Sequence, residues 1–199
     1  MTPMFGIIAS QISGHLSTAA YDSIATVTVS SPTTTVTFSS IPSTYKHLEI
    51  RTLGRIGSGN YGPGEVYMRF NSDTTYTNYY GHYFQAGGPT PSVGSGPSAA
   101  NSNARGLQLG MFTGGSASSS LLGGGVVTIF DYANTNKYKT SRSLAGADFN
   151  GAIGGTGGYI SLDSGFWMST SAINRIDIQP YSTESFQSPT TFALYGIKG

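Results

Sequence analysis

The most restrictive feature of the sequence is the alternation of its last ten residues, Thr190–Gly199. Phe192 and Leu194 share one side of an extended chain, and Tyr195 and Ile197 share the other. A period of two with apolar residues on both sides is typical of a central strand that is buried on both faces. The pattern therefore predicts a β-rich fold whose sheet includes the last residues of the sequence.

Short segments with strand-like patterns follow one another along the rest of the chain. We expect strands at 23–30, 34–38, 47–55, 65–70, 78–85, 106–112, 125–132, 137–144, 159–168 and 172–179. The turn residues Ser31, Pro32 and Thr33 predict a hairpin between the first two of these strands. The polar segment 137–144 is expected at a sheet edge or on a solvent-facing side, and Gly165 predicts a β-bulge.

No stretch has the pattern of a long amphipathic helix, and Gly, Ser, Thr and Tyr, which are abundant here, are poor helix formers. Many short strands separated by turn residues are typical of a sandwich or a barrel. We therefore predict an all-β fold, an antiparallel β-sandwich with jelly-roll-like connections. Long Gly/Ser-rich loops are expected at 87–103 and 114–125, with a further glycine-rich connection at 151–158.

The first twenty residues differ from the remainder, which divides the chain into an arm at 1–20 and a sandwich domain at 21–199. The apolar side chains of Phe5, Ile7, Ile8 and Ile12 are separated by small and polar residues. One interpretation is a frayed terminus or a first edge strand. The other is an extended arm that docks on a neighbouring subunit, because an uncovered apolar run promotes aggregation.

The composition limits the classes of partner. Charged residues make up 10% of the chain, against roughly 25% in an average domain, and the formal net charge is +1. This balance gives no bulk attraction to nucleic acid or to anionic membranes, and no segment is apolar for the length of a membrane span. The absence of cysteine excludes disulfides, thiol catalysis and cysteine-bound metals. We expect neither a nucleic-acid nor a membrane partner.

No sequence motif strongly indicates a catalytic, metal-binding or cofactor-binding site. The segment 57–62 matches the G-x-G-x-x-G pattern, but a strand rather than a helix is expected after it, so a hairpin loop is favoured over a dinucleotide site. Asp131, Asn134 and Asn136 offer oxygen ligands without calcium-loop spacing, which favours an Asx-stabilised turn. The histidines lack metal-site spacing, and no carboxylate pair is visible. We predict no enzyme activity, no metal and no cofactor.

A tyrosine cluster is the most suggestive group of side chains. It comprises Tyr76, Tyr79, Tyr80, Tyr83 and Phe84. Strand alternation places Tyr79 and Tyr83 on one face and Tyr80, His82 and Phe84 on the other. The cluster can serve ordinary core packing, a contact with another subunit, or stacking on a glycan, because tyrosine combines a large apolar ring with a polar hydroxyl.

Several short sequence segments, which follow one another through most of the chain, resemble segments of a known family. They are Met4–Gln11, Tyr21–Val29, Phe38–Leu48, Phe70–Asp73, Asp131–Lys139, Gly165–Met168 and Phe192–Gly199. Together they are similar to small virion structural proteins of tailed phages, especially aquatic and cyanobacterial phages. The resemblance implies a non-enzymatic β-sandwich in the assembled particle, but it supplies no site residues.

Within that resemblance, we expect a capsid decoration (cement) protein that clamps neighbouring capsomers, with the major capsid protein as partner and a homotrimer as its own assembly. The expected location is the virion, assembled in the host cytoplasm. The alternative is a tail-fibre or tail-tip subunit that binds host-surface glycan through its tyrosines. A glycan hydrolase ranks last because the sequence shows no carboxylate pair.

The arm prediction can be tested by deletion. Removing residues 2–16 should leave a folded domain, because the sandwich begins after them, but should abolish assembly with particles. Circular dichroism of the truncated protein and its co-sedimentation with particles measure the two properties. Normal particle binding by the truncated protein would contradict the docking arm.

Overall fold

The structure is a computed structural model that describes residues 20–57, 64–87, 91–97, 106–115, 117–149, 157–181 and 183–199. Apart from one 3₁₀ turn, η1 (Tyr76–Asn78), every regular element in these residues is a strand. The strands are β1 (Tyr21–Val29), β2 (Val36–Phe38), β3 (His47–Ile56), β4 (Gly64–Phe70), β5 (Tyr79–Ala86), β6 (Pro91–Pro97), β7 (Leu107–Phe112), β8 (Gly123–Phe130), β9 (Lys139–Asp148), β10 (Gly158–Trp167), β11 (Ile176–Pro180) and β12 (Phe186–Ile197).

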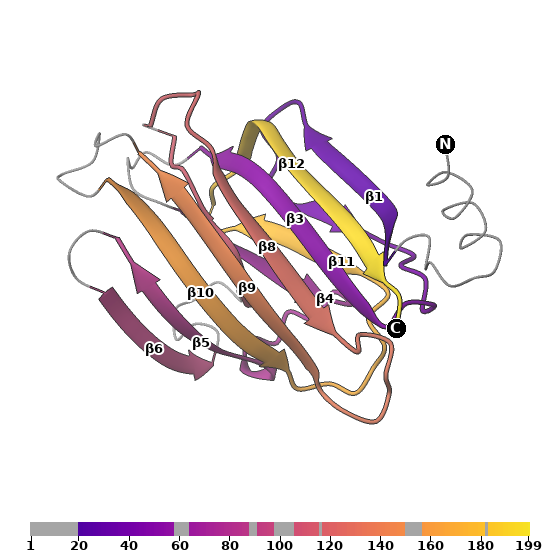
Figure 1. The fold of residues 1–199 in the computed structure, drawn as a ribbon. Coiled ribbons are helices and arrows are strands. Elements are labelled where there is room, and N and C mark those ends of the chain that lie inside the picture. The colour runs from indigo at the N-terminus through magenta and orange to yellow at the C-terminus, as the bar shows by residue number, and fades with distance from the viewer. Residues whose placement is uncertain are drawn as a thin grey trace, which may run out of the picture.

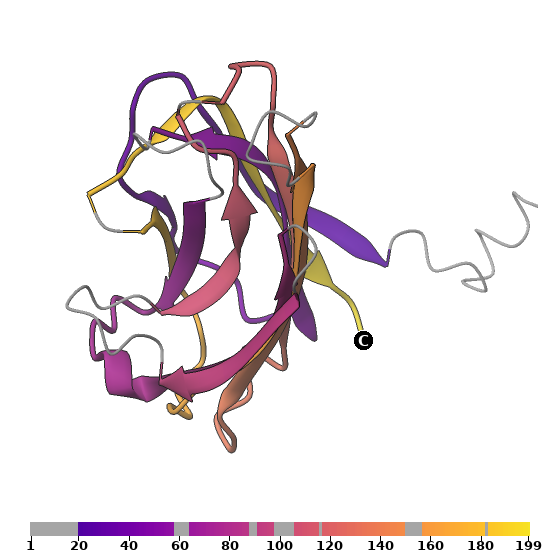
Figure 2. The same ribbon diagram turned by 90° about the vertical axis from the view of Figure 1, so that its left-hand side faces the viewer.

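The strands form two antiparallel sheets that pack face to face, which confirms the predicted all-β sandwich (Figures 1 and 2). The larger sheet has eight strands in the order β1-β12-β3-β8-β9-β10-β5-β6. The smaller sheet has four strands in the order β2-β11-β4-β7. Jelly-roll-like connectivity stays a prediction. The described part of the predicted arm is Ala20 alone, and β1 starts at Tyr21, where the sandwich domain was expected to begin.

The C-terminal strand β12 is central, as its alternation predicted, because it pairs with β1 on one side and β3 on the other. Its burial differs from the prediction. Phe192 and Leu194 are fully buried, whereas Tyr195 and Ile197 on the opposite face are only half-buried. In the described part of the chain no second layer covers that face, and Arg51 lies over the Tyr195 ring at 5.0 Å from its centroid. The strand is therefore buried on one side.

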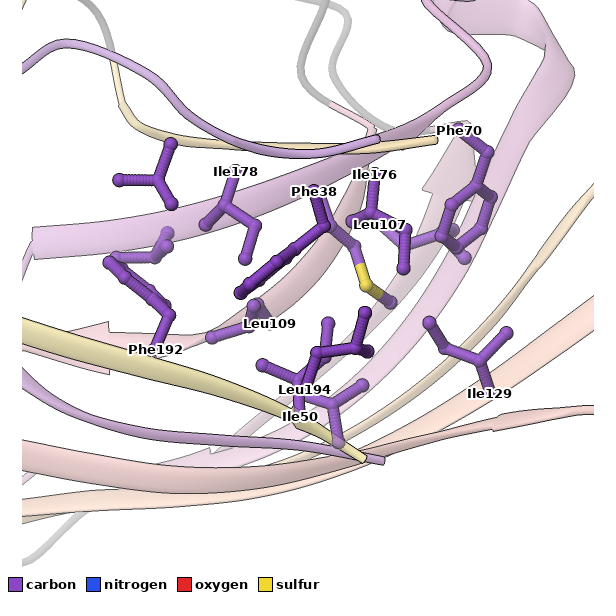
Figure 3. Packing of buried hydrophobic residues seen from close by; sticks show 14 of the residues in the cluster. Phe38, Ile50, Phe70, Leu107, Leu109, Ile129, Ile176, Ile178, Phe192 and Leu194 are labelled. Atoms are coloured by element: carbon purple, nitrogen blue, oxygen red, sulfur yellow. The ribbon is translucent and has the colours of Figure 1, made fainter. Parts of the chain in front are cut away.

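The core lies between the two sheets, and both contribute large apolar side chains to it (Figure 3). The smaller sheet supplies Phe38, Phe70, Leu107, Leu109, Ile176 and Ile178, and the larger supplies Ile50, Ile129, Phe192 and Leu194. Aromatic rings pack edge to face within it, as Phe186 and Phe192 do at 4.9 Å between centroids. Burial of these side chains, at roughly 1.5–3 kcal/mol each, is the main force that holds the two sheets together.

Two predicted hairpins are wrong. Strands β1 and β2 belong to different sheets, so the Ser31-Pro32-Thr33 segment carries the chain across the sandwich. The connection that contains the glycine-rich segment 57–62 also joins different sheets, from β3 to β4, and a strand follows it instead of the helix that a dinucleotide site needs. Local turn residues do not distinguish a hairpin from a crossover, because both reverse the chain.

Three local predictions need correction. Strand β9 does not lie at an edge, because it pairs with β8 and β10 in the middle of the larger sheet; Thr140 and Arg142 on its outer side face solvent, as the alternative prediction had it. Gly165 pairs with both neighbouring strands without a register shift, so it forms no bulge. A Cβ there would lie 2.8 Å from the Tyr80 carbonyl oxygen, so the glycine permits a close approach instead. Part of the predicted loop 87–103 forms the edge strand β6.

A buried lysine fixes one end of the sandwich. The side chain of Lys139 is completely buried, and its ammonium donates hydrogen bonds to the carbonyls of Asn134, Lys137 at 2.9 Å and Thr170 at 3.0 Å. Burial lowers the pKa of this ammonium. The three carbonyls belong to the turn between β8 and β9 and to the segment after β10, so one side chain joins the two connections.

Replacement of Lys139 by Ala should lower the free energy of unfolding by roughly 2–4 kcal/mol, because three carbonyls lose the donor that a buried ammonium supplies. Lys137→Ala is the matched control. Its side chain is 51% exposed, so a loss of at most about 1 kcal/mol is expected. Urea denaturation measures both variants. Equal losses would show that the buried hydrogen bonds are not the important difference.

Candidate functional site

A continuous row of exposed apolar side chains crosses the outer face of the larger sheet. The apolar row consists of one residue from each of five neighbouring strands, namely Val126, Leu144, Leu162, Phe84 and Val93. Each is the direct register partner of the next. Their exposed fractions run from 42% for Val126 to 73% for Val93. The outer face of an antiparallel sheet is usually polar, so a row of this length indicates a contact surface.

The next register level widens the apolar row. Leu53 and Ile160 are 52% and 53% exposed, and between them lie Gly124 and Gly146. Glycines on this face leave the backbone accessible, and the level forms a shallow depression bordered by Leu144 and Ile160. On the other side of the apolar row, the register partners Thr128, Arg142, Ser164 and His82 are polar. The apolar surface is therefore bounded by a polar rim.

A polar cleft lies where the larger sheet extends beyond β7, the edge strand of the smaller sheet. Its volume is about 270 Å³. Strands β5, β6, β9 and β10 form one wall, and β4 and β7 form the other. In Figure 1, β5 and β6 form this end of the larger sheet, beyond β10. The side chains that carry chemistry in the cleft are Glu65, Tyr67, Tyr83, Gln108 and Asp163.

Asp163 is the most perturbed carboxylate of the cleft. The residue is 4% exposed, and burial raises the pKa of its carboxyl to about 6, although the hydroxyls of Ser161 and Ser143 favour the ionised form. Ser143 Oγ donates to Asp163 Oδ2 at 3.3 Å. The charge of Glu65, which lines the same cleft, also raises this pKa. The cleft thus brings together two carboxylates that are far apart in the linear sequence.

Several polar atoms around the cleft are buried without a hydrogen-bond partner among the described residues. Two of them line the cleft itself, Asp163 Oδ1 and Gln108 Nε2. The Tyr159 hydroxyl is likewise buried and unpaired among the described residues. Burial raises the pKa of this hydroxyl, and the charges of Asp163 and Glu65 raise it further. Buried polar groups in proteins are almost always paired with protein, water or ligand.

The tyrosines of the predicted cluster are dispersed. Tyr79 is buried against Trp167, and its hydroxyl accepts from the Phe70 amide at 3.1 Å and donates to the Asp73 carbonyl at 3.0 Å. A partner therefore reaches Tyr79 only if the core opens. Tyr83 lines the cleft on the same face of the strand, as the alternation predicted.

The remaining predicted contact residues occupy other places. Tyr80 is half-buried and stacks on Phe166 at 5.5 Å between centroids, and Tyr76 is 47% exposed in η1. Phe5, Ile7, Ile8 and Ile12 lie outside the described residues, so their contact role stays a prediction.

The segment Asp131–Asn136 forms a turn, as expected. Asn134 Oδ1 accepts from the Asn136 amide at 2.8 Å, which is an Asx turn. The carboxylate of Asp131 pairs with Lys137 and with Lys46, and these two ammonium groups lower its pKa to about 2. Across the residues that the structure describes, no group of three or more His, Asp or Glu side chains is arranged to hold a metal ion.

Comparison with known proteins gives no match: no family model, no curated protein and no solved structure is significantly similar to the chain. Among the described residues, no helix has the length and apolar character required to cross a membrane. The geometry described above is therefore the basis for the functional proposal.

The raised pKa of Asp163 predicts the pH dependence of stability. Ionisation of this carboxyl disfavours the folded state, so its contribution to stability falls as pH rises from about 4 to about 6. Asp163→Asn removes that cost and should raise the free energy of unfolding at pH 7 by about 1–3 kcal/mol. Urea denaturation at pH 4 and pH 7 measures the difference.

Asp177→Asn is the contrasting variant. Burial opposes its ionisation, but hydrogen bonds from Arg175 and Thr37 outweigh burial and hold the pKa of Asp177 below the usual value. Its charge therefore stabilises the fold above pH 4, and the variant should be less stable at pH 7. A loss of stability in both variants would contradict the cost assigned to Asp163.

Proposed function

We propose that the chain is a non-enzymatic structural protein of a phage virion, a capsid decoration (cement) protein that attaches to the shell through the apolar row. The observation that supports this proposal is the uninterrupted line of exposed apolar side chains on Val126, Leu144, Leu162, Phe84 and Val93. The resemblance to virion proteins of tailed phages supports it independently.

The dimensions of the apolar row fit an interface. Five adjacent strands at about 4.8 Å spacing give a line of roughly 20 Å, which is comparable to the apolar centre of a protein–protein contact. The polar residues beside it, including Arg142 and His82, correspond to the polar rim of such a contact. With a formal net charge of +1, the protein approaches a shell or another copy of itself without strong repulsion. We propose the major capsid protein as partner and a homotrimer as the assembled form.

The attachment surface can be tested by the double variant Leu144→Ser/Leu162→Ser. Both side chains are about half exposed and face away from the core, so folding should change by less than about 1 kcal/mol. Binding to shells that lack the protein should weaken at least about tenfold, because adjacent apolar contacts at the centre of an interface are lost. Co-sedimentation with purified shells measures the binding.

Thr26→Ala on β1 is the matched control, since Thr26 is an exposed polar residue on a strand that lies outside the apolar row and its polar rim. It should bind shells like the unmodified protein. If the double variant binds normally while remaining folded, the apolar row is not the attachment surface.

The second candidate function is a tail-fibre or tail-tip subunit that binds host-surface glycan. The polar cleft favours it, because carboxylates, an amide and a tyrosine ring are the groups that proteins use to hold uncharged polar ligands. The abundance of the chain in purified virions separates the two functions. A shell protein should approach the major capsid protein in copy number, whereas a tail protein should be far below it.

A further inference from the structure

We propose that the polar cleft between the end of the larger sheet and the edge of the smaller sheet is a binding site for a neutral saccharide, with Asp163 as the hydrogen-bond acceptor for its hydroxyl groups. This inference goes beyond attachment to a shell and gives the second candidate function a specific site. It concerns the isolated chain, so it can fail while the proposed attachment surface stands.

Asp163 is a buried acceptor on the wall of the cleft that the larger sheet forms. The residue is 4% exposed and lines the cleft. Its Oδ1 atom has no hydrogen-bond partner among the described residues, although the nearby Ser161 hydroxyl favours the ionised carboxyl. The other oxygen, Oδ2, accepts from Ser143 Oγ. A buried carboxylate oxygen without a donor is energetically costly, and such groups cluster at functional sites.

The opposite wall supplies complementary groups. Gln108 Nε2 is a buried donor without an acceptor among the described residues. Glu65 accepts a hydrogen bond from the Tyr67 hydroxyl at 2.7 Å, which orients its carboxylate. The two walls therefore place carboxylate acceptors and an amide donor beside the same space, a combination that suits the hydroxyl groups of a sugar.

The charge of the cleft restricts the ligand class. The described residues that line the cleft include two carboxylates, Asp163 and Glu65, and no lysine or arginine, so these residues favour a ligand that donates hydrogen bonds. Because no three ligating side chains converge in the described part of the chain, a metal ion is not favoured either. A neutral ligand that donates several hydrogen bonds fits these groups.

Size and shape restrict the ligand further. A volume of about 270 Å³ lies just below the range of about 300–1,000 Å³ for ordinary ligand pockets, which suits a single sugar ring. Tyr83 is 36% exposed and lies along the cleft, where its ring offers a face for stacking. Gly81 lies two residues earlier, on the same face of β5, and a Cβ there would meet only ordinary contact, 3.7 Å from the Ser164 carbonyl oxygen. A larger side chain at Gly81 would therefore fill the cleft instead of disrupting the strand.

The test measures whether D-glucose, D-galactose, D-mannose or N-acetyl-D-glucosamine binds to the isolated full-length chain. Saturation-transfer NMR and calorimetry detect the binding. We expect at least one sugar to bind. Asp163→Asn should weaken that binding at least about tenfold, since a charge-assisted hydrogen bond is lost. Gly81→Val should abolish it by filling the cleft.

Leu162→Ala is the matched control, because it alters the neighbouring residue on the opposite face of β10 and should leave sugar binding unchanged. Urea denaturation establishes that each variant is folded. Absence of binding to all four sugars, unchanged binding in Asp163→Asn, or preferential binding of sodium phosphate would overturn the proposal. Hydrolysis of a β-linked disaccharide by the wild type but not by Asp163→Asn would support the site while contradicting the non-enzymatic role.

Discussion

The unequal width of the two sheets is the constraint on which the rest of the structure depends. At about 4.8 Å between strands, four strands cover roughly half of what eight strands present. The core forms where the sheets overlap, and the uncovered end of the larger sheet must satisfy its inward-facing side chains in another way. The cleft is the result, because β5 and β6 continue past the edge strand β7.

This geometry reverses the usual pattern on the strands beside the cleft. On β9 and β10, the polar residues Ser143 and Asp163 face inward, and the apolar residues Leu144 and Leu162 face outward. Uncovered antiparallel sheets normally place apolar side chains toward the core. The reversal explains why one pair of strands contributes to both candidate surfaces, the polar cleft inside and the apolar row outside.

The fold class was predictable, because alternating segments and turn residues permit few alternatives to a β-sandwich. The functional surfaces were less so. Alternation shows that Leu162 and Asp163 lie on opposite faces, but it does not say which face is covered. The proximity of Glu65 and Asp163 depends on which strands become neighbours across the sandwich, and crossovers such as β3 to β4 are not encoded in local turns. A signal was present in the sequence, namely the uninterrupted polar run at 139–143, which leaves no apolar face to that part of the strand.

The two edge strands of the larger sheet, β6 and β1, affect whether two copies of the chain can pair strand to strand. The strand β6 begins and ends with proline and contains glycine, and β1 has an irregular register between Ser23 and Ala25. Both features make an edge a poor template for another strand. These two edges of the larger sheet therefore disfavour strand pairing between two copies of the chain. Contacts made through side chains, unlike a shared sheet, form and dissociate without unfolding either molecule.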